Sequence, residues 1–133
     1  MDLNRTPAEI ASSAAEEIRA LNHRTIKSDA YLTPPDLAYT AGHITALVQR
    51  LSQALQQMEA GIRTLDEGNK IRLADRHPTE VSQNDIAAAV STVAFGLSEA
   101  RRAIGSAEPY LREAMQVLNS LGGPWPEDDD EQG

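Results

Sequence analysis

The chain has 133 residues, the size of one ordinary domain, and a formal net charge of −8. Apolar residues make up 41 % of it but aromatic residues only 4 %, so its core must be built from Ala, Leu, Ile and Val, which suits closely packed helices. The absence of cysteine excludes disulfides and thiolate chemistry. No secretory signal opens the chain, and no apolar run is long enough to span a membrane. We therefore expect a cytoplasmic protein without a membrane segment.

The negative charge is concentrated near the C-terminus. Five consecutive acidic residues supply much of it: Glu127, Asp128, Asp129, Asp130 and Glu131. We expect residues 1–123 to form a single helical-bundle domain and residues 124–133 an acidic, disordered tail.

The first helix is expected over about residues 7–28. Thr6 offers a capping hydroxyl, Pro7 suits the first helical position, and Glu9 completes a capping box. The large apolar residues of this segment are few: Ile10, Ile18, Leu21 and Ile26. Because it has so little apolar area to bury, we expect this helix to be the least stable one.

The second helix is expected over 34–67. Thr33 and Asp36 repeat the capping chemistry at its start, and Gly68-Asn69 can adopt the left-handed conformation that ends it. Its apolar residues form two rows of sevenfold spacing, which we expect to face the bundle. The first row is Leu37, Ile44, Leu51, Met58 and Leu65; the second is Ala41, Val48, Leu55 and Ile62.

The third helix is expected over 83–121, from a cap at Ser82 to the helix-ending Gly122-Gly123-Pro124. Two apolar rows run through it as well. The first is Val90, Leu97, Ile104, Leu111 and Leu118; the second is Ile86, Val93, Ala100, Ala107, Ala114 and Leu121. Both rows keep their register through Pro109, and Gly105 four residues earlier eases the clash with the proline ring. This favours one helix kinked near Pro109 over two helices meeting at Ser106.

These elements predict an all-α fold, an elongated antiparallel three-helix bundle that runs up, down, up. The alternative is a four-helix protein in which the third segment is split at Ser106.

No catalytic, cofactor-binding or metal-binding residue emerges from the sequence. His23, His43 and His77 lie in three different elements, without the Glu-x-x-His spacing of carboxylate-bridged metal sites. There is neither a nucleophile elbow nor a glycine-rich phosphate loop. We therefore predict a non-catalytic scaffold, adaptor or regulator without a cofactor, with a small enzyme or ligand carrier as a distant alternative.

Three residues are predicted to contact a protein partner. Ala88 and Phe95 point away from the apolar rows, so they are either covered by the first helix or form a contact with a second copy or another protein. Trp125 and the acidic tail either dock on the basic end of the first helix, around His23 and Arg24, or remain free.

The partner is expected to be a protein or a second copy of the chain in a homodimer. A nucleic-acid-associated regulator is the alternative, with a small basic patch in the connection between the second and third helices: Lys70, Arg72, Arg76 and His77. The acidic net charge makes nucleic acid an unfavourable partner.

Overall fold

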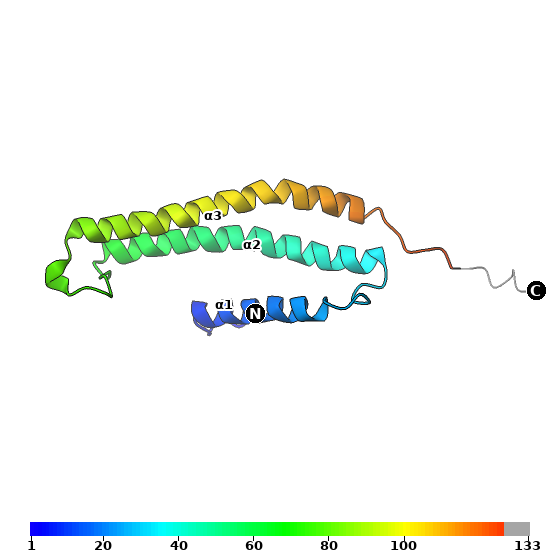
Figure 1. Cartoon of the computed structure of the whole chain (residues 1–133), viewed down its shortest axis with the longest axis horizontal. Helices are drawn as coiled ribbons and strands as arrows, with labels where there is room; N and C mark the ends of the chain where they lie inside the picture. Colours follow the sequence, from blue (N-terminus) through cyan, green and yellow to red (C-terminus); the bar gives the residue numbers. More distant parts are fainter. Residues whose placement is uncertain (127–133) are drawn as a thin grey trace, which may run out of the picture. The chain divides into compact units, whose positions relative to one another are not determined.

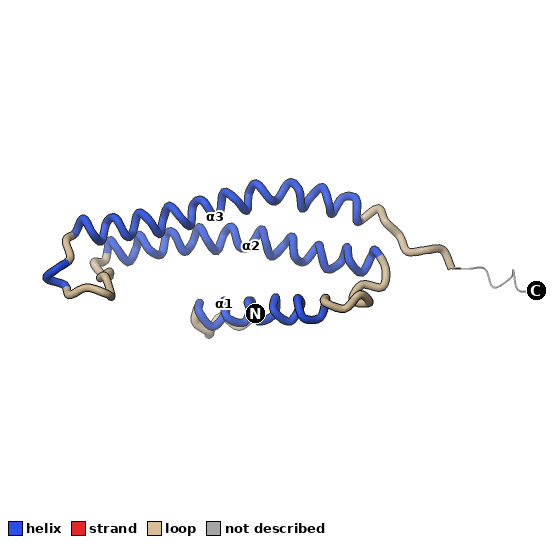
Figure 2. Tube along the Cα trace, in the orientation of Figure 1, coloured by secondary structure: helices blue, strands red, loops and turns tan. Residues whose placement is uncertain are grey.

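A computed structural model describes residues 1–126 of the 133. Three α-helices are present, α1 (Pro7–Arg24), α2 (Pro34–Glu67) and α3 (Gln83–Leu118), with one short 3₁₀ helix, η1 (Pro78–Glu80), before α3 (Figure 2). No strand occurs among residues 1–126. The predicted all-α class, with three α-helices of which two are long, is confirmed.

The residues fall into two compact units. The first contains Met1–Leu37, and thus α1, together with the described residues from Leu121 onward; the second is Ala38–Ser120. The second unit is a hairpin, in which α2 and α3 lie side by side along their length (Figure 1). The predicted acidic run, residues 127–131, lies outside the described part of the chain.

The helix starts are set by the predicted capping residues. The Thr6 hydroxyl accepts the Glu9 amide at 3.2 Å, while the Glu9 carboxylate accepts the Thr6 amide at 2.9 Å. Ser82 and Asp85 form the same reciprocal pair at the start of α3. The Thr33 amide donates to the Asp36 carboxylate at 3.0 Å before α2. Each pair satisfies amides that have no partner inside the helix.

Two of the helix ends differ from the predictions. α1 ends at Arg24 rather than near residue 28, and the residues that follow it form turns. α3 ends at Leu118, before the Gly-Gly-Pro segment. The end of α2 is as predicted: Asn69 takes a left-handed φ of 53° and the Lys70 amide donates to the Leu65 carbonyl.

α3 passes through Pro109 as one helix that curves along its second half (Figure 1). The four-helix alternative with a break at Ser106 is therefore wrong. A Cβ added at Gly105 would meet nothing within 4 Å, so this position is open.

The core of the described chain is small. Only Ala38, Val90 and Ala94 are buried, and no large side chain is fully buried. None of the residues of α1 is buried. Burial of large apolar side chains is the main term that stabilises a domain, and several such side chains, among them Leu51, Met58 and Leu65, are more than a third exposed.

Candidate protein-interaction face

Two contacts fix the register of α2 against α3. The Met115 Cε would lie 3.7 Å from a Cβ placed on Gly42, and the Glu59 carboxylate lies 3.7 Å from the Arg101 guanidinium. Residue numbers rise along α2 as they fall along α3 between these pairs, so the helices are antiparallel. In this register Leu51 lies level with Ala107, and Met58 lies level with Ala100.

The two helices meet along a seam that follows a spacing of three and four residues. On α2 the least exposed residues of this spacing are Ala38, Ala41, Thr45, Val48, Ser52, Leu55, Glu59, Ile62 and Asp66. On α3 they are Val90, Ala94, Leu97, Arg101, Ile104, Glu108, Leu111, Met115 and Leu118. This is the contact pattern of a two-stranded antiparallel coiled coil.

Only one of the two predicted apolar rows on each helix lies in the seam. The rows that begin at Ala41 and Val90 contact the opposite helix, as expected. The place of the second row is taken by polar and charged residues, among them Ser52 and Glu59 on α2 and Arg101 on α3. The expectation that all the apolar rows face the interior of the chain is thus wrong for half of them.

The displaced rows form a surface that we call the apolar face. Its residues are Ile44, Leu51, Met58 and Leu65 on α2, with Val93, Ala100, Ala107 and Ala114 on α3. On α2 and on α3 alike, the row of the apolar face precedes a row of the seam by one residue, so it flanks the seam in the same sense on both right-handed helices. Because the two helices are antiparallel, these flanking rows lie on the same side of the hairpin. The exposed fraction is 45 % at Leu51, 57 % at Met58 and 45 % at Leu65.

The apolar character extends outward by one further row on each helix. These rows are Leu47, Ala54 and Gly61 on α2, and Ala89, Gly96, Ala103, Tyr110 and Val117 on α3. About a quarter of the residues in the chain are charged (24 %), yet neither the apolar face nor these rows contain a charged side chain. A helix that faces only water does not keep two adjacent rows free of charge along its whole length.

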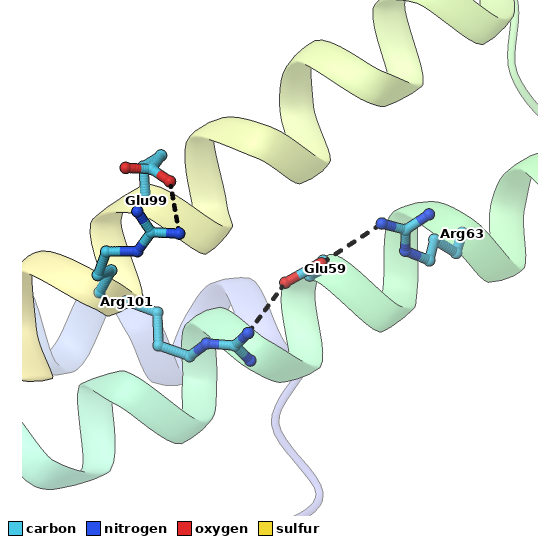
Figure 3. Close-up of polar contacts among 5 residues, drawn as sticks. Glu59, Arg63, Glu99 and Arg101 are labelled. Carbon is cyan, nitrogen blue, oxygen red and sulfur yellow. Dashed lines mark hydrogen bonds and ion pairs between the residues drawn. The ribbon is translucent and has the colours of Figure 1, made fainter.

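The other side of the seam, which we call the polar flank, is hydrophilic. Glu59 lies between two arginines, with Arg63 at 3.4 Å on its own helix and Arg101 at 3.7 Å across the seam (Figure 3). Over the turns of α2 that precede Glu59, Gln49, Gln53 and Gln56 line an open depression together with Glu108 of α3. Ion pairs and contact with water can satisfy the polar groups of this side.

The predicted contact residues lie elsewhere. Phe95 is 68 % exposed and Ala88 is exposed, on a row of α3 that also carries Arg102 and lies on the polar-flank side. Trp125 is 93 % exposed in the first unit. A single exposed apolar residue among polar ones is common on protein surfaces. A partner contact at these three positions stays a prediction.

The predicted basic patch lies in the connection between α2 and α3, where all four of its side chains are exposed. The His77 ring Nδ1 lies 2.8 Å from the Thr79 hydroxyl and accepts the Thr79 amide, which caps η1. This histidine thus has a structural role. Nucleic-acid binding by the patch stays a prediction.

Other kinds of site find no support in the part of the chain that the structure describes. Within residues 1–126, no three His, Asp or Glu side chains come together as metal ligands. In the same residues, none of the helices is at once long and apolar enough to cross a lipid bilayer. Hydrogen bonds from the Ser82 amide and hydroxyl, aided by the charge of Arg76, lower the pKa of the Asp85 carboxyl.

The geometry defines a class: an all-helical protein whose long antiparallel hairpin has one polar side and one uncovered apolar side. No protein-family model, no curated protein and no solved structure matched the chain. The function must therefore be argued from the hairpin itself.

Proposed function

We propose that the chain is a non-catalytic protein-interaction module that works by presenting the apolar face of the α2–α3 hairpin to a protein partner. One observation carries the proposal: three large apolar side chains in the second half of α2, Leu51, Met58 and Leu65, are about half exposed, while the buried residues of the described chain number three. The eight side chains of the apolar face include no titratable group, so the face offers contact area and shape rather than proton transfer or nucleophilic chemistry.

The size of the face suits a protein partner. On α2 the face runs from Ile44 to Leu65, which at about 1.5 Å per residue gives a length of roughly 30 Å. A helix or a pair of helices lying along this hairpin would cover it, whereas a small molecule would cover only a fraction. The roles that such contacts serve are those of a scaffold, an adaptor or a regulator.

Site-specific photo-cross-linking in cells that produce the chain tests the proposal. A photoreactive amino acid replaces Met58 on the apolar face or, as the matched control, its neighbour Gln57 on the exposed back of α2. We expect a discrete covalent protein adduct from position 58 and none from position 57. Equal labelling from positions 57 and 58 would overturn the proposal. So would the absence of an adduct from all three of the positions 51, 58 and 65 when each carries the photoreactive amino acid.

A further inference from the structure

The apolar face has large side chains that the described chain leaves exposed. Leu51, Met58 and Leu65 are 45 %, 57 % and 45 % exposed. No charged side chain lies among the residues of the face, so contact with water is unfavourable along it. An occupant from outside the chain would bury these side chains.

We infer that this occupant is a second copy of the same hairpin. This inference rests on the proposed function. The two rows of the apolar face differ in size. On α2 they are large side chains, Leu51 and Met58 at the centre, and on α3 the residues at the same levels are alanines, Ala107 and Ala100. The face thus consists of a ridge beside a groove.

A ridge beside a groove is complementary to its own copy under one two-fold axis. When that axis runs parallel to the helices, between two faces that oppose each other, α2 of each copy lies on α3 of the other. Leu51 of one copy then meets Ala107 of the other, and Met58 meets Ala100. Every helix is antiparallel to its neighbours in the resulting core of four helices.

The area and the charge of the face both suit this dimer. The face runs from Ile44 to Leu65 on α2, roughly 30 Å at about 1.5 Å per residue, and two helices of about 10 Å diameter make it roughly 20 Å wide. It thus offers roughly 600 Å² per copy, or about 1,200 Å² for the pair, which is the lower end of the range of stable complexes. The chain carries a net charge of −8, but none of that charge lies on the face. Opposed copies therefore bring no charged side chain of the face into the interface, so no ion is desolvated there.

Light scattering and sedimentation of the purified full chain test the inference. We expect a mass twice the 14.4 kDa of the chain. Met58→Glu places a charge in the interface and is expected to weaken association by about 100-fold or more. Gln57→Glu introduces the same side chain on the back of α2 and is expected to leave the mass unchanged. Retention of the dimer by Met58→Glu would overturn the inference.

Ala107→Leu separates the ridge-and-groove arrangement from unspecific apolar association. It adds apolar area at an exposed position and removes nothing from the hairpin, so it keeps the test valid if Met58→Glu unfolds. Filling the groove is expected to weaken the dimer about 10-fold, because the Leu51 ridge of the second copy then clashes. Equal or tighter association of Ala107→Leu would contradict the arrangement. Loss of the dimer in Phe95→Glu but not in Met58→Glu would place the interface on the other side of α3 and overturn it.

The two proposals fail in different ways. If the chain stays monomeric up to submillimolar concentration but cross-links to another protein from position 58, the self-association is wrong and the proposed function stands. If the chain neither dimerises nor cross-links from the apolar face, both the self-association and the proposed function are wrong.

Discussion

The two sides of the α2–α3 seam belong to the same pair of helices and yet have opposite chemistry. On one side, Glu59 bridges to Arg101 and glutamines line an open depression. On the other, Leu51, Met58 and Leu65 remain about half exposed. The polar side is complete as it stands, because water can solvate it. The apolar side is incomplete, because its exposure to water costs free energy that a partner would recover. The difference indicates that the hairpin is part of a larger core.

The largest change inside the hairpin is expected from Leu55→Ala. Leu55 is half-buried, in the seam row next to the apolar face. Its truncation removes apolar contacts and leaves a gap, which should lower the free energy of unfolding by about 2 kcal/mol. Chemical denaturation followed by circular dichroism measures it. If Leu55→Ala costs no more than Ser52→Ala, in the same seam but on the polar side, the contrast between the sides is wrong.

Ser82→Ala provides a reference that touches neither side of the seam. The Ser82 hydroxyl accepts the Asp85 amide at 3.2 Å at the start of α3, and its loss should cost about 1 kcal/mol. Ser82→Asn keeps a side-chain acceptor and should restore most of the stability. An unchanged denaturation midpoint in Ser82→Ala would mean that the cap contributes nothing to the folded state.

Glu59→Gln should have a smaller effect, although it breaks the ion pair across the seam. The Glu59 side chain is 18 % exposed and that of Arg101 33 %, so solvent screens the pair and about 0.5 kcal/mol is expected. The difference between Glu59→Gln and the unchanged chain should shrink as salt is added. A loss as large as that of Leu55→Ala would show that the polar side carries the hairpin.

The smallest effect concerns Asp85, whose carboxyl has a pKa lowered in the folded state, chiefly by the Ser82 amide and hydroxyl. A lowered pKa means that the folded state favours the charged form. The contribution is therefore present above the unfolded pKa of about 4 and is lost as the pH falls below it. When the pH is lowered through this range, the thermal midpoint of the unchanged chain should thus fall slightly more than the midpoint of Asp85→Asn. Parallel midpoints would contradict the assignment.

Much of the fold could be predicted from local sequence signals. Capping pairs such as Thr6 with Glu9 act within one turn, so three of them located the helix starts. Helix ends were predicted less well, because neither glycine nor proline follows Arg24 to mark the end of α1. The unbroken heptads through Pro109 correctly indicated a single α3.

The choice of seam could not be predicted from apolar periodicity. The period identifies a broad apolar stripe but not which part of it the neighbouring helix occupies. The structure shifts the seam toward one edge of the stripe, so that Ser52 and Glu59, which belong to neither predicted row, lie in it. One signal was available: Glu59 and Arg101 have opposite charges and lie level in the antiparallel register. For the same reason the sequence predicts that the apolar face lies in the interior of the chain, and that Ala88 and Phe95 are the exposed apolar residues of α3.

The central claim, that the apolar face is completed by association, is tested most directly by the thermal midpoint of the full chain as a function of its concentration. If association supplies the missing core, the midpoint must rise with concentration, because mass action stabilises a folded state that exists as an oligomer. We predict such a rise from micromolar to submillimolar chain, and its loss in Met58→Glu. A midpoint that stays constant over this range, with a monomeric mass throughout, would contradict it.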